Sequence, residues 1–156
     1  MIDIGSMAPD ATFEHADGRR GAIADYRGAP LVLYFYPKDD TPGCTTEAQA
    51  FSALASDFEA VGAKVLGASR DTSASHAKFS AKRGLTVPLV ADTDGSLCAA
   101  FGVWVEKSMY GKSYWGIERA TFLVDADGQI VSAWRKVKVA GHAEAVLSAA
   151  RDLTAR

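Results

Sequence analysis

The chain has 156 residues, of which 48% are hydrophobic and 23% are charged, with 17 basic and 19 acidic side chains. This composition is that of an ordinary globular protein and differs from that of disordered, collagenous or disulfide-rich chains. A chain of this length can bury one sizeable core, so we expect a single domain over residues 1–156. The net charge is −2 and Lys and Arg do not cluster, which argues against a nucleic-acid partner.

Membrane insertion and secretion are not expected either. The longest apolar run, Leu31 to Tyr36, has six residues, whereas a membrane-spanning helix needs about 20. The first residues, Met1 to Gly5, show no basic segment followed by an apolar stretch, which a secretory signal would need. We therefore expect a soluble, cytoplasmic protein.

The first predicted elements are strands that lead into a helix. Residues 11–14 and 21–23 flank a turn signal and predict an N-terminal β-hairpin. The continuous apolar and β-branched run at residues 30–36 is typical of a central strand covered on both faces. A polar loop follows, and from about residue 43 to 60 the apolar side chains recur every three or four positions, which predicts a helix.

Strands and helices alternate through the rest of the chain. The predicted elements are a strand at 63–68, a helix at 73–83, a short strand at 87–90 whose Pro88 favours an irregular or edge start, a short helix at 94–101, two strands at 117–124 and 129–134 joined by a hairpin turn, and a helix at 142–153. This pattern predicts an α/β fold with a central mixed β-sheet flanked by helices and an N-terminal β-hairpin extension.

The two cysteines, Cys44 and Cys98, limit the possible chemistry. Two cysteines cannot complete a four-ligand structural zinc site, and their spacing of 54 excludes a Cys-x-x-Cys redox motif. A structural disulfide is not expected in a reducing compartment. Each cysteine is therefore either a buried small hydrophobic residue or a reactive thiol.

Cys44 lies near the start of the predicted helix that follows the core strand and the polar loop. Thr41 suits the N-cap and Pro42 the first helical position, which places Cys44 in the first turn. Free backbone N–H groups and the positive end of the helix dipole stabilise a thiolate there. The alternative is a small residue in a tight turn, although a position after the carboxyl end of a strand favours a functional site.

Arg119 is a charged residue in an apolar pattern. Alternation along residues 117–124 places Arg119 on the same strand face as Ile117 and Leu123. An arginine in such surroundings either lays its stem along apolar neighbours with its head in water, or directs a cation into a site. The pattern leaves both alternatives open.

The segment around Cys44 resembles a known active site. Pro37-x-x-x-Thr41-x-x-Cys44 is similar to the peroxiredoxin motif, and Thr-Pro-Gly-Cys-Thr at residues 41–45 resembles its bacterioferritin-comigratory-protein, or peroxiredoxin Q, branch. Three later segments resemble the same branch in the same order, and they are 101–104, 111–112 and 116–124. The resemblance extends from about Gly5 to the final helix. It implies a thioredoxin-like fold and a thiol-dependent peroxidase that reduces hydrogen peroxide and organic hydroperoxides.

The resemblance also implies how the first residues of the site act. Cys44 would be the peroxidatic nucleophile, Thr41 and Gly43 would bind the peroxide, and Pro37 would shield the site from water. Stabilising a thiolate raises its fraction at neutral pH by only ~30-fold. Most of the rate enhancement must therefore come from elsewhere.

The resemblance implies that Arg119 contributes to the rate enhancement beyond thiolate formation. It would hold the thiolate and the polarised peroxide together, and Glu47 would help to fix the guanidinium. Each well-placed donor to the charge that develops on the leaving oxygen contributes on the order of 10²–10³ in rate. We therefore expect transition-state electrostatics to dominate over thiolate formation.

Cys98 is the candidate resolving cysteine by the same resemblance. Many relatives carry a second cysteine five residues after the first, but here that position is Gln49. Some similar proteins keep their resolving cysteine near position 98, which implies an intramolecular Cys44–Cys98 disulfide. That bond needs Cα atoms within ~7 Å and local unwinding of both helices, which the Ala-rich, poorly capped surroundings of Cys98 favour. If Cys98 is instead an inert core thiol, the protein is a one-cysteine enzyme that needs an external thiol.

The expected partners and the rival functions follow from these assignments. The resemblance implies thioredoxin or a related dithiol protein as reductant, a monomer, and no metal, flavin or haem. A non-enzymatic redox-sensing or client-binding module on the same fold is the alternative. A Cys–His hydrolase is more distant, because His15, His76 and His142 lie in separate segments and each is expected to be solvated or structural.

Overall fold

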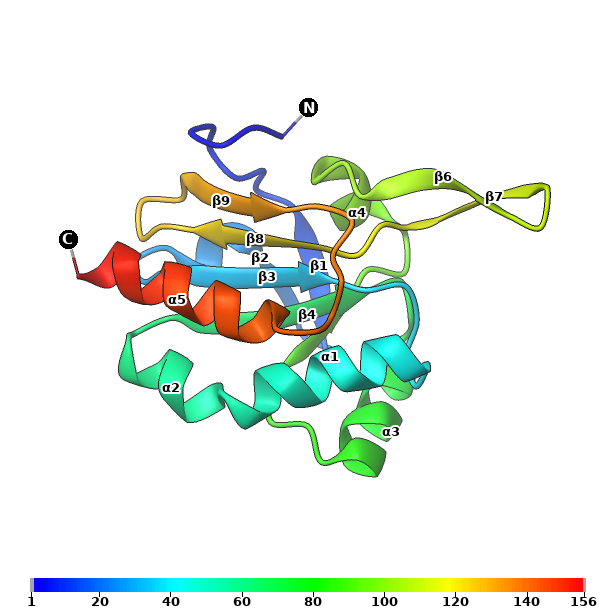
Figure 1. Ribbon diagram of the computed structural model, residues 1–156, viewed down its shortest axis with the longest axis horizontal. Coiled ribbons are helices and arrows are strands. Elements are labelled where there is room, and N and C mark those ends of the chain that lie inside the picture. The colour runs from blue at the N-terminus through cyan, green and yellow to red at the C-terminus, as the bar shows by residue number, and fades with distance from the viewer. Residues whose placement is uncertain (1, 156) are drawn as a thin grey trace.

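The apolar run after Pro30 forms the central strand β3, Leu31–Phe35, and all of its residues are buried. In the computed structural model, which describes residues 2–155, this strand lies inside a seven-stranded mixed sheet in the order β2-β1-β5-β4-β3-β8-β9 (Figure 1). β4 and β5 run parallel to β3, and the remaining neighbours pair antiparallel. The other strands of this sheet are β1 (Thr12–His15), β2 (Arg20–Ala22), β4 (Lys64–Ser69), β5 (Leu89–Ala91), β8 (Ala120–Val124) and β9 (Ile130–Trp134).

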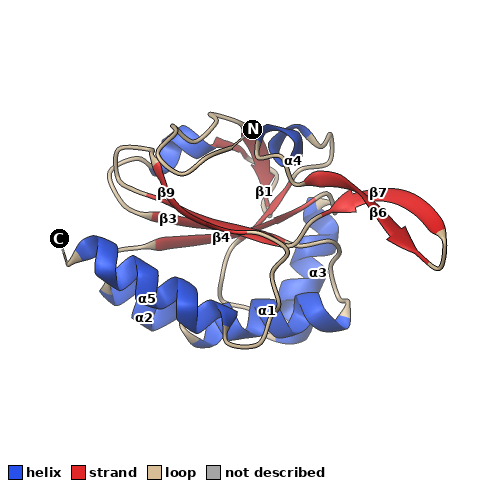
Figure 2. Ribbon diagram, turned by 45° about the horizontal axis from the view of Figure 1, so that its top comes forward, coloured by secondary structure: helices blue, strands red, loops and turns tan. Residues whose placement is uncertain are grey.

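Helices cover the two faces of the sheet unequally, as Figure 2 shows. One face carries four helices, and these are α1 (Pro42–Ala53), α2 (Ala55–Ala60), α3 (Ser73–Arg83) and α5 (His142–Thr154). The other face carries the short helix α4 (Ser96–Ala100) and the 3-10 turn η1 (Ile23–Tyr26). None of the helices within residues 2–155 combines the length and the apolar character that a membrane span requires.

Two hydrophobic clusters lie on opposite sides of the sheet because successive side chains of a strand alternate between its faces. Val32 and Tyr34 of β3 pack with α1, α2, α3 and α5, whereas Leu33 and Phe35 pack with α4. Cys44 belongs to the first cluster and Cys98 to the second. The sheet therefore separates the two cysteines.

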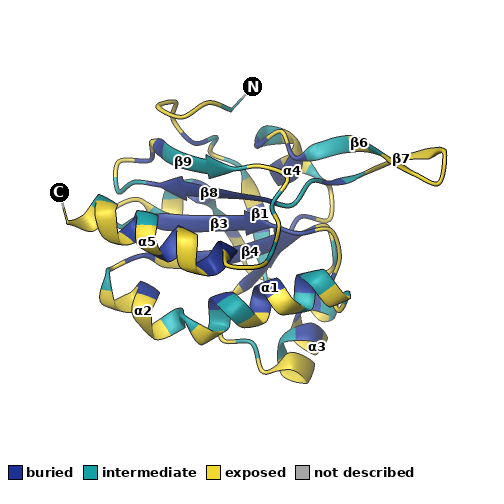
Figure 3. Ribbon diagram, in the orientation of Figure 1, coloured by how far each residue is buried: buried dark blue, intermediate teal, exposed yellow. Residues whose placement is uncertain are grey.

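A two-stranded ribbon that the sequence pattern did not predict extends from the body (Figure 3). It consists of β6 (Trp104–Met109) and β7 (Lys112–Ile117), paired antiparallel in a separate sheet. Most residues of the ribbon are exposed, and they include Tyr110, Tyr114 and Trp115. Without a buried face, these strands lack the alternation of apolar and polar residues from which strands are predicted.

The predicted order of strands and helices is confirmed, with three local differences. The helix expected over residues 43–60 is two helices, because the backbone leaves helical geometry at Leu54. The short strand after Pro88 is an interior strand between β1 and β4 that begins at Leu89, so of the two alternatives for its start the edge position is wrong. The strand expected over 117–124 is divided, since β7 ends at Ile117 and β8 begins at Ala120.

Candidate active site

The N-terminus of α1 holds Cys44 at the carboxyl edge of the sheet. Thr41 has the extended backbone of an N-cap residue and Pro42 is the first helical residue, so Cys44 is the third, as predicted. The Thr41 side chain does not cap the helix, because its hydroxyl donates to the carbonyl oxygen of Lys38 at 2.9 Å. This bond closes the loop before the helix. The first-turn N–H groups of Gly43 and Cys44 have no partner within the helix.

Arg119 lies directly against the sulfur of Cys44. Its Nη2 donates to Sγ at 3.3 Å, and Cys44 is only 2% exposed. The contact follows from strand register: Ala120 pairs with Phe35, so the preceding residue lies beside the end of β3, next to the start of α1. Arg119 therefore occupies the break between two strands rather than the interior of one. Of the two alternatives for this arginine, the structure supports the cation directed into a site.

Glu47 fixes the orientation of the guanidinium. It lies one turn after Cys44 on the same side of α1, and its Oε1 accepts from Arg119 Nη1 at 2.7 Å. Arg119 thus bridges the sulfur and the carboxylate. Glu47 is 1% exposed and its Oε2 has no hydrogen-bond partner. Burial therefore raises the pKa of Glu47 to about 7, although the charge of Arg119 opposes the shift.

This raised pKa predicts a dependence of stability on pH. Between pH 4.5 and about 7 the folded protein holds a proton on Glu47 that the unfolded chain has released, so stability falls as the pH rises through this window. Over this window the free energy of unfolding falls by an amount on the order of 3 kcal/mol. Urea unfolding at pH 5 and pH 8 measures this change in the free energy of unfolding for the wild type and for Glu47→Gln. The difference between the two proteins isolates the contribution of Glu47, because their other ionisable groups are the same. We expect a smaller pH effect in Glu47→Gln, and identical pH profiles would contradict the raised pKa.

Gly43 allows the guanidinium to approach the helix. A Cβ atom built at this position would lie 3.2 Å from Nη2 of Arg119, closer than an ordinary van der Waals contact. A larger side chain would therefore displace the donor that contacts Cys44. Steric room beside the arginine explains glycine here.

An open cavity of about 430 Å³ lies beside this centre and has Pro37 in its wall. Trp104 and Trp115 of the β6–β7 ribbon form part of the wall, together with Lys107. Partial burial and the positive charge of Arg119 lower the pKa of Lys107, so its ammonium group lies within the field of the site. Lys107 was not identified from the sequence, because the ribbon that carries it was not predicted.

Cys98 is fully buried in the cluster on the other face of the sheet. The carboxylate of Asp92 accepts from the backbone N–H groups of Leu97 and Cys98 at 2.9 and 2.8 Å, so α4 is capped from outside the helix. The expectation of a poorly capped α4 is therefore wrong. Burial and the neighbouring Asp92 raise the pKa of the Cys98 thiol well above its usual value.

The histidines do not contact the sulfur of Cys44 in the described part of the chain. His142 is buried, its Nε2 lies 2.8 Å from the hydroxyl oxygen of Thr121, and its ring packs edge-on against Phe51. Burial and the nearby charge of Arg119 lower the pKa of His142 to about 4, so the ring is neutral. Within residues 2–155, no group of three or more His, Cys, Asp or Glu side chains is arranged to hold a metal ion.

Comparison with known proteins gives a consistent set of relatives. Residues 4–133 match the model of the AhpC/TSA family. Peroxiredoxin Bcp of Xanthomonas campestris is 54% identical over 153 residues, which cover 96% of each chain. Peroxiredoxin Bcp of Bacillus subtilis is 43% identical over 153 residues, which cover 98% of each chain.

Solved structures agree with these relatives. The bacterioferritin comigratory protein of X. campestris, studied for alkyl peroxide reduction, superposes with a TM-score of 0.90 at 50% identity and covers 99% of this chain and 98% of its own. A peroxiredoxin Q structure from the same organism gives the same TM-score and coverage. This similarity confirms the thioredoxin-like fold expected from the sequence. The chain belongs to the AhpC/TSA family and, within it, to the Bcp or peroxiredoxin Q branch of thiol-dependent peroxidases.

Proposed function

We propose that Cys44 is the peroxidatic nucleophile of this enzyme and that Arg119 is its main electrostatic partner. The contact that carries the proposal is the 3.3 Å hydrogen bond from Arg119 Nη2 to Cys44 Sγ. A guanidinium in this position stabilises the thiolate before the reaction and the polarised peroxide during it. Glu47 acts on the reaction indirectly, by holding Arg119 in place.

The proposed reaction is a two-electron displacement at oxygen. The Cys44 thiolate attacks the terminal oxygen of ROOH, an S–O bond forms and the O–O bond breaks. The leaving RO⁻ takes up a proton and departs as ROH, and the cysteine is left as the sulfenic acid. Arg119 and the first-turn N–H groups of α1 are the donors available to the negative charge that develops on the two oxygens.

Thr41, Gly43 and Pro37 complete the proposed site. The Thr41 hydroxyl already donates to Lys38, so its oxygen can accept a hydrogen bond from the peroxide O–H. Gly43 leaves room for the guanidinium and offers a backbone N–H to the peroxide. Pro37 lies in the wall of the adjoining cavity, where its ring excludes water from the approach to the sulfur.

Hydrogen peroxide and organic hydroperoxides are the proposed substrates. The cavity beside the site has tryptophan side chains in its wall and is large enough for an organic group. The X. campestris relative, studied for alkyl peroxide reduction, supports the same substrate class. The test is the second-order rate constant of Cys44 oxidation with hydrogen peroxide and with an alkyl hydroperoxide, each compared with a free thiol. An enzyme exceeds the free thiol by orders of magnitude, because the donors at the site add to the effect of thiolate formation.

The rival function is a redox-sensing or client-binding module on the same fold. Such a module would oxidise at Cys44 no faster than the ~30-fold that thiolate formation can supply. The same rate constant therefore separates the two functions. The position of Arg119 against the sulfur favours the enzyme, since a slow sensor has no need of a donor at the leaving oxygen.

Cys98 is the proposed resolving cysteine. Its thiol would attack the Cys44 sulfenic acid to form the Cys44–Cys98 disulfide and release water. Both cysteines are free in the structure, and the sheet lies between their clusters. The first turn of α1 and all of α4 would have to unwind, and α4 would have to lose the bonds from Leu97 and Cys98 to Asp92.

Replacement of Cys98 separates oxidation from resolution. In Cys98→Ser we expect an unchanged rate of Cys44 oxidation, no linked peptide, and accumulation of sulfinic acid on Cys44 with excess peroxide. Stopped-flow kinetics and peptide mass spectrometry measure these outcomes. The control is Ala99→Ser, which adds a hydroxyl to an exposed neighbouring position of α4 and should still form the disulfide. If Cys98→Ser accumulates no more sulfinic acid than the wild type, Cys98 is not the resolving cysteine.

The remaining proposals concern the reductant, the oligomeric state, the location and the cofactor requirement of the enzyme. Thioredoxin or a related dithiol protein is the proposed reductant, because a disulfide between two protein cysteines is reduced by thiol–disulfide exchange. A monomeric, cytoplasmic enzyme is proposed with it, and neither metal nor organic cofactor is needed by the reaction written above.

A further inference from the structure

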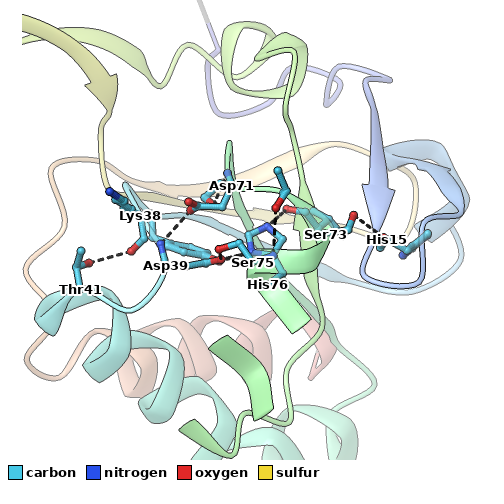
Figure 4. A network of polar contacts seen from close by, with 12 residues as sticks. His15, Lys38, Asp39, Thr41, Asp71, Ser73, Ser75 and His76 are labelled. Carbon is cyan, nitrogen blue, oxygen red and sulfur yellow. Dashed lines mark hydrogen bonds and ion pairs between the residues drawn. The ribbon is translucent and has the colours of Figure 1, made fainter. Parts of the chain in front are cut away.

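A buried hydrogen-bonded pair, Asp39 and His76, ties the loop before Cys44 to helix α3 (Figure 4). Asp39 lies in this loop, between Pro37 and Thr41, and its side chain is only 5% exposed. His76 belongs to α3 and its side chain is fully buried. The Nδ1 atom of His76 lies 2.8 Å from Oδ2 and 3.0 Å from Oδ1 of Asp39.

The hydrogen-bond partners of His76 fix its orientation. Its Nε2 lies 3.0 Å from the carbonyl oxygen of Val90, which can only accept, so Nε2 donates. Its Nδ1 faces the carboxylate of Asp39, so both ring nitrogens are engaged. Burial alone would raise the pKa of Asp39, but hydrogen bonds from His76 and Tyr36 outweigh it and hold that pKa below its usual value.

Further bonds fix the rest of Asp39. The Tyr36 hydroxyl donates to Oδ1 at 2.6 Å, and the Ser75 hydroxyl donates to Oδ2 at 2.7 Å. The backbone N–H of Asp39 donates to Asp71 Oδ2 at 2.9 Å. The backbone N–H and the side chain of this loop residue are therefore both hydrogen-bonded. A network with every member paired is rigid, whereas loss of one member leaves buried polar groups without partners.

A second, exposed connection joins the same loop to α3. Asp40 forms ion pairs of 2.7 Å with Lys82 and 2.8 Å with Arg83. The side chains of Lys82 and Arg83 are 60% and 37% exposed, so solvent screens these pairs. The buried Asp39–His76 pair is therefore the stronger connection. His76, which was expected from the sequence to be solvated or structural, is buried against the active-site loop.

We propose that Asp39 and His76 are positioning residues that hold the active-site loop in the conformation that reacts with peroxide, and that release of this pair exposes Cys44. The loop carries Pro37 and the Lys38 carbonyl that receives the Thr41 bond, and it leads directly into the first turn of α1. Cys44 is 2% exposed, so a large reagent reaches its sulfur only when this segment opens. The proposal rests on the proposed role of Cys44. Its test distinguishes a failure of the loop-positioning role from a failure of the role of Cys44.

Two reagents that use the same nucleophile provide the test. Reaction with hydrogen peroxide needs the organised site, whereas alkylation by a bulky maleimide needs only an exposed thiolate. In His76→Gln we expect peroxide oxidation of Cys44 to slow by roughly 10²-fold, because small misplacements in an active site have effects of this size. We expect alkylation of Cys44, followed by peptide mass, to become several-fold faster. A change in thiolate fraction would move both rates in the same direction, so opposite changes identify a positioning role.

Milder and matched variants complete the experiment. Ser75→Ala removes one donor to Asp39 and should show the same opposite changes at smaller size. Lys82→Gln removes an exposed ion pair on the same helix and should leave both rates within two-fold of the wild type. Circular dichroism checks that each variant is folded.

Three results would overturn the proposal. They are unchanged rates in His76→Gln and Ser75→Ala, parallel loss of both reactions in these variants, and equal effects of Lys82→Gln and His76→Gln. If wild-type Cys44 reacts with peroxide no faster than a free thiol, the proposed function fails instead. The alkylation rates then still decide whether the pair holds the loop.

Discussion

Replacement of Cys44 by serine is expected to remove all peroxide turnover. A serine hydroxyl is not ionised at neutral pH and forms no sulfenic acid, so the reaction has no nucleophile to begin from. Arg119 and the other donors at the site would stay in place without a reaction to accelerate. The measurement is peroxide consumption with a small dithiol as reductant, over a range of enzyme concentrations.

The matched control for this variant is Cys98→Ser, which keeps Cys44 and should react with peroxide at the wild-type rate. Thermal unfolding of both variants checks that the loss does not arise from unfolding, since both cysteines are buried. Substantial turnover by Cys44→Ser would mean that another group reduces the peroxide.

Arg119→Ala is expected to slow oxidation of Cys44 by 10²-fold or more. The guanidinium donates to the sulfur at 3.3 Å and is the donor best placed for the charge on the leaving oxygen. Thiolate formation alone accounts for only ~30-fold, so the expected loss exceeds what a change in ionisation can explain. Stopped-flow measurement of the second-order rate constant as a function of pH separates the two contributions, because at high pH the thiolate fraction is complete in both proteins.

Two further variants give this experiment its controls. Arg119→Lys keeps a positive charge but has one nitrogen, which cannot contact Cys44 and Glu47 as the two guanidinium nitrogens do. We expect a partial loss. Arg135→Ala removes a nearby guanidinium that pairs with Glu118 rather than with the sulfur, and we expect a rate close to that of the wild type. A loss of only a few-fold in Arg119→Ala at high pH would show that transition-state electrostatics do not dominate.

The local part of the site could be predicted from the sequence because it is contiguous. The polar loop, Thr41 at the N-cap and Cys44 in the first turn follow from residues that are neighbours along the chain. The pairing of Cys44 with Arg119 depends instead on the register of β8 against β3. Alternation along 117–124 identified Arg119 as a charged residue among apolar ones, but it placed this arginine within a continuous strand. The break between Ile117 and Ala120 could not be predicted, because the hydrophobicity of the sequence does not change there.

Other features depend on contacts between distant residues and could not be predicted. Nothing in the sequence around His76 indicates that its partner is Asp39, because the connection arises only when α3 packs beneath the loop. The β6–β7 ribbon is exposed on most of its surface, so it lacks the periodicity that burial imposes. The placement of Cys98 opposite Cys44 follows from the crossing of the chain to the other face of the sheet.

The most direct test of the account is the mass of the reduced protein, intact and as peptides, after one equivalent of hydrogen peroxide without added thiol. We predict a loss of two hydrogens and a peptide that links Cys44 to Cys98. Oxygen on Cys44, with Cys98 still open to alkylation, would keep Cys44 as the nucleophile and reject Cys98 as its resolving partner. An unchanged mass, or oxidation confined to residues other than Cys44, would contradict the central claim that Cys44 reacts with peroxide.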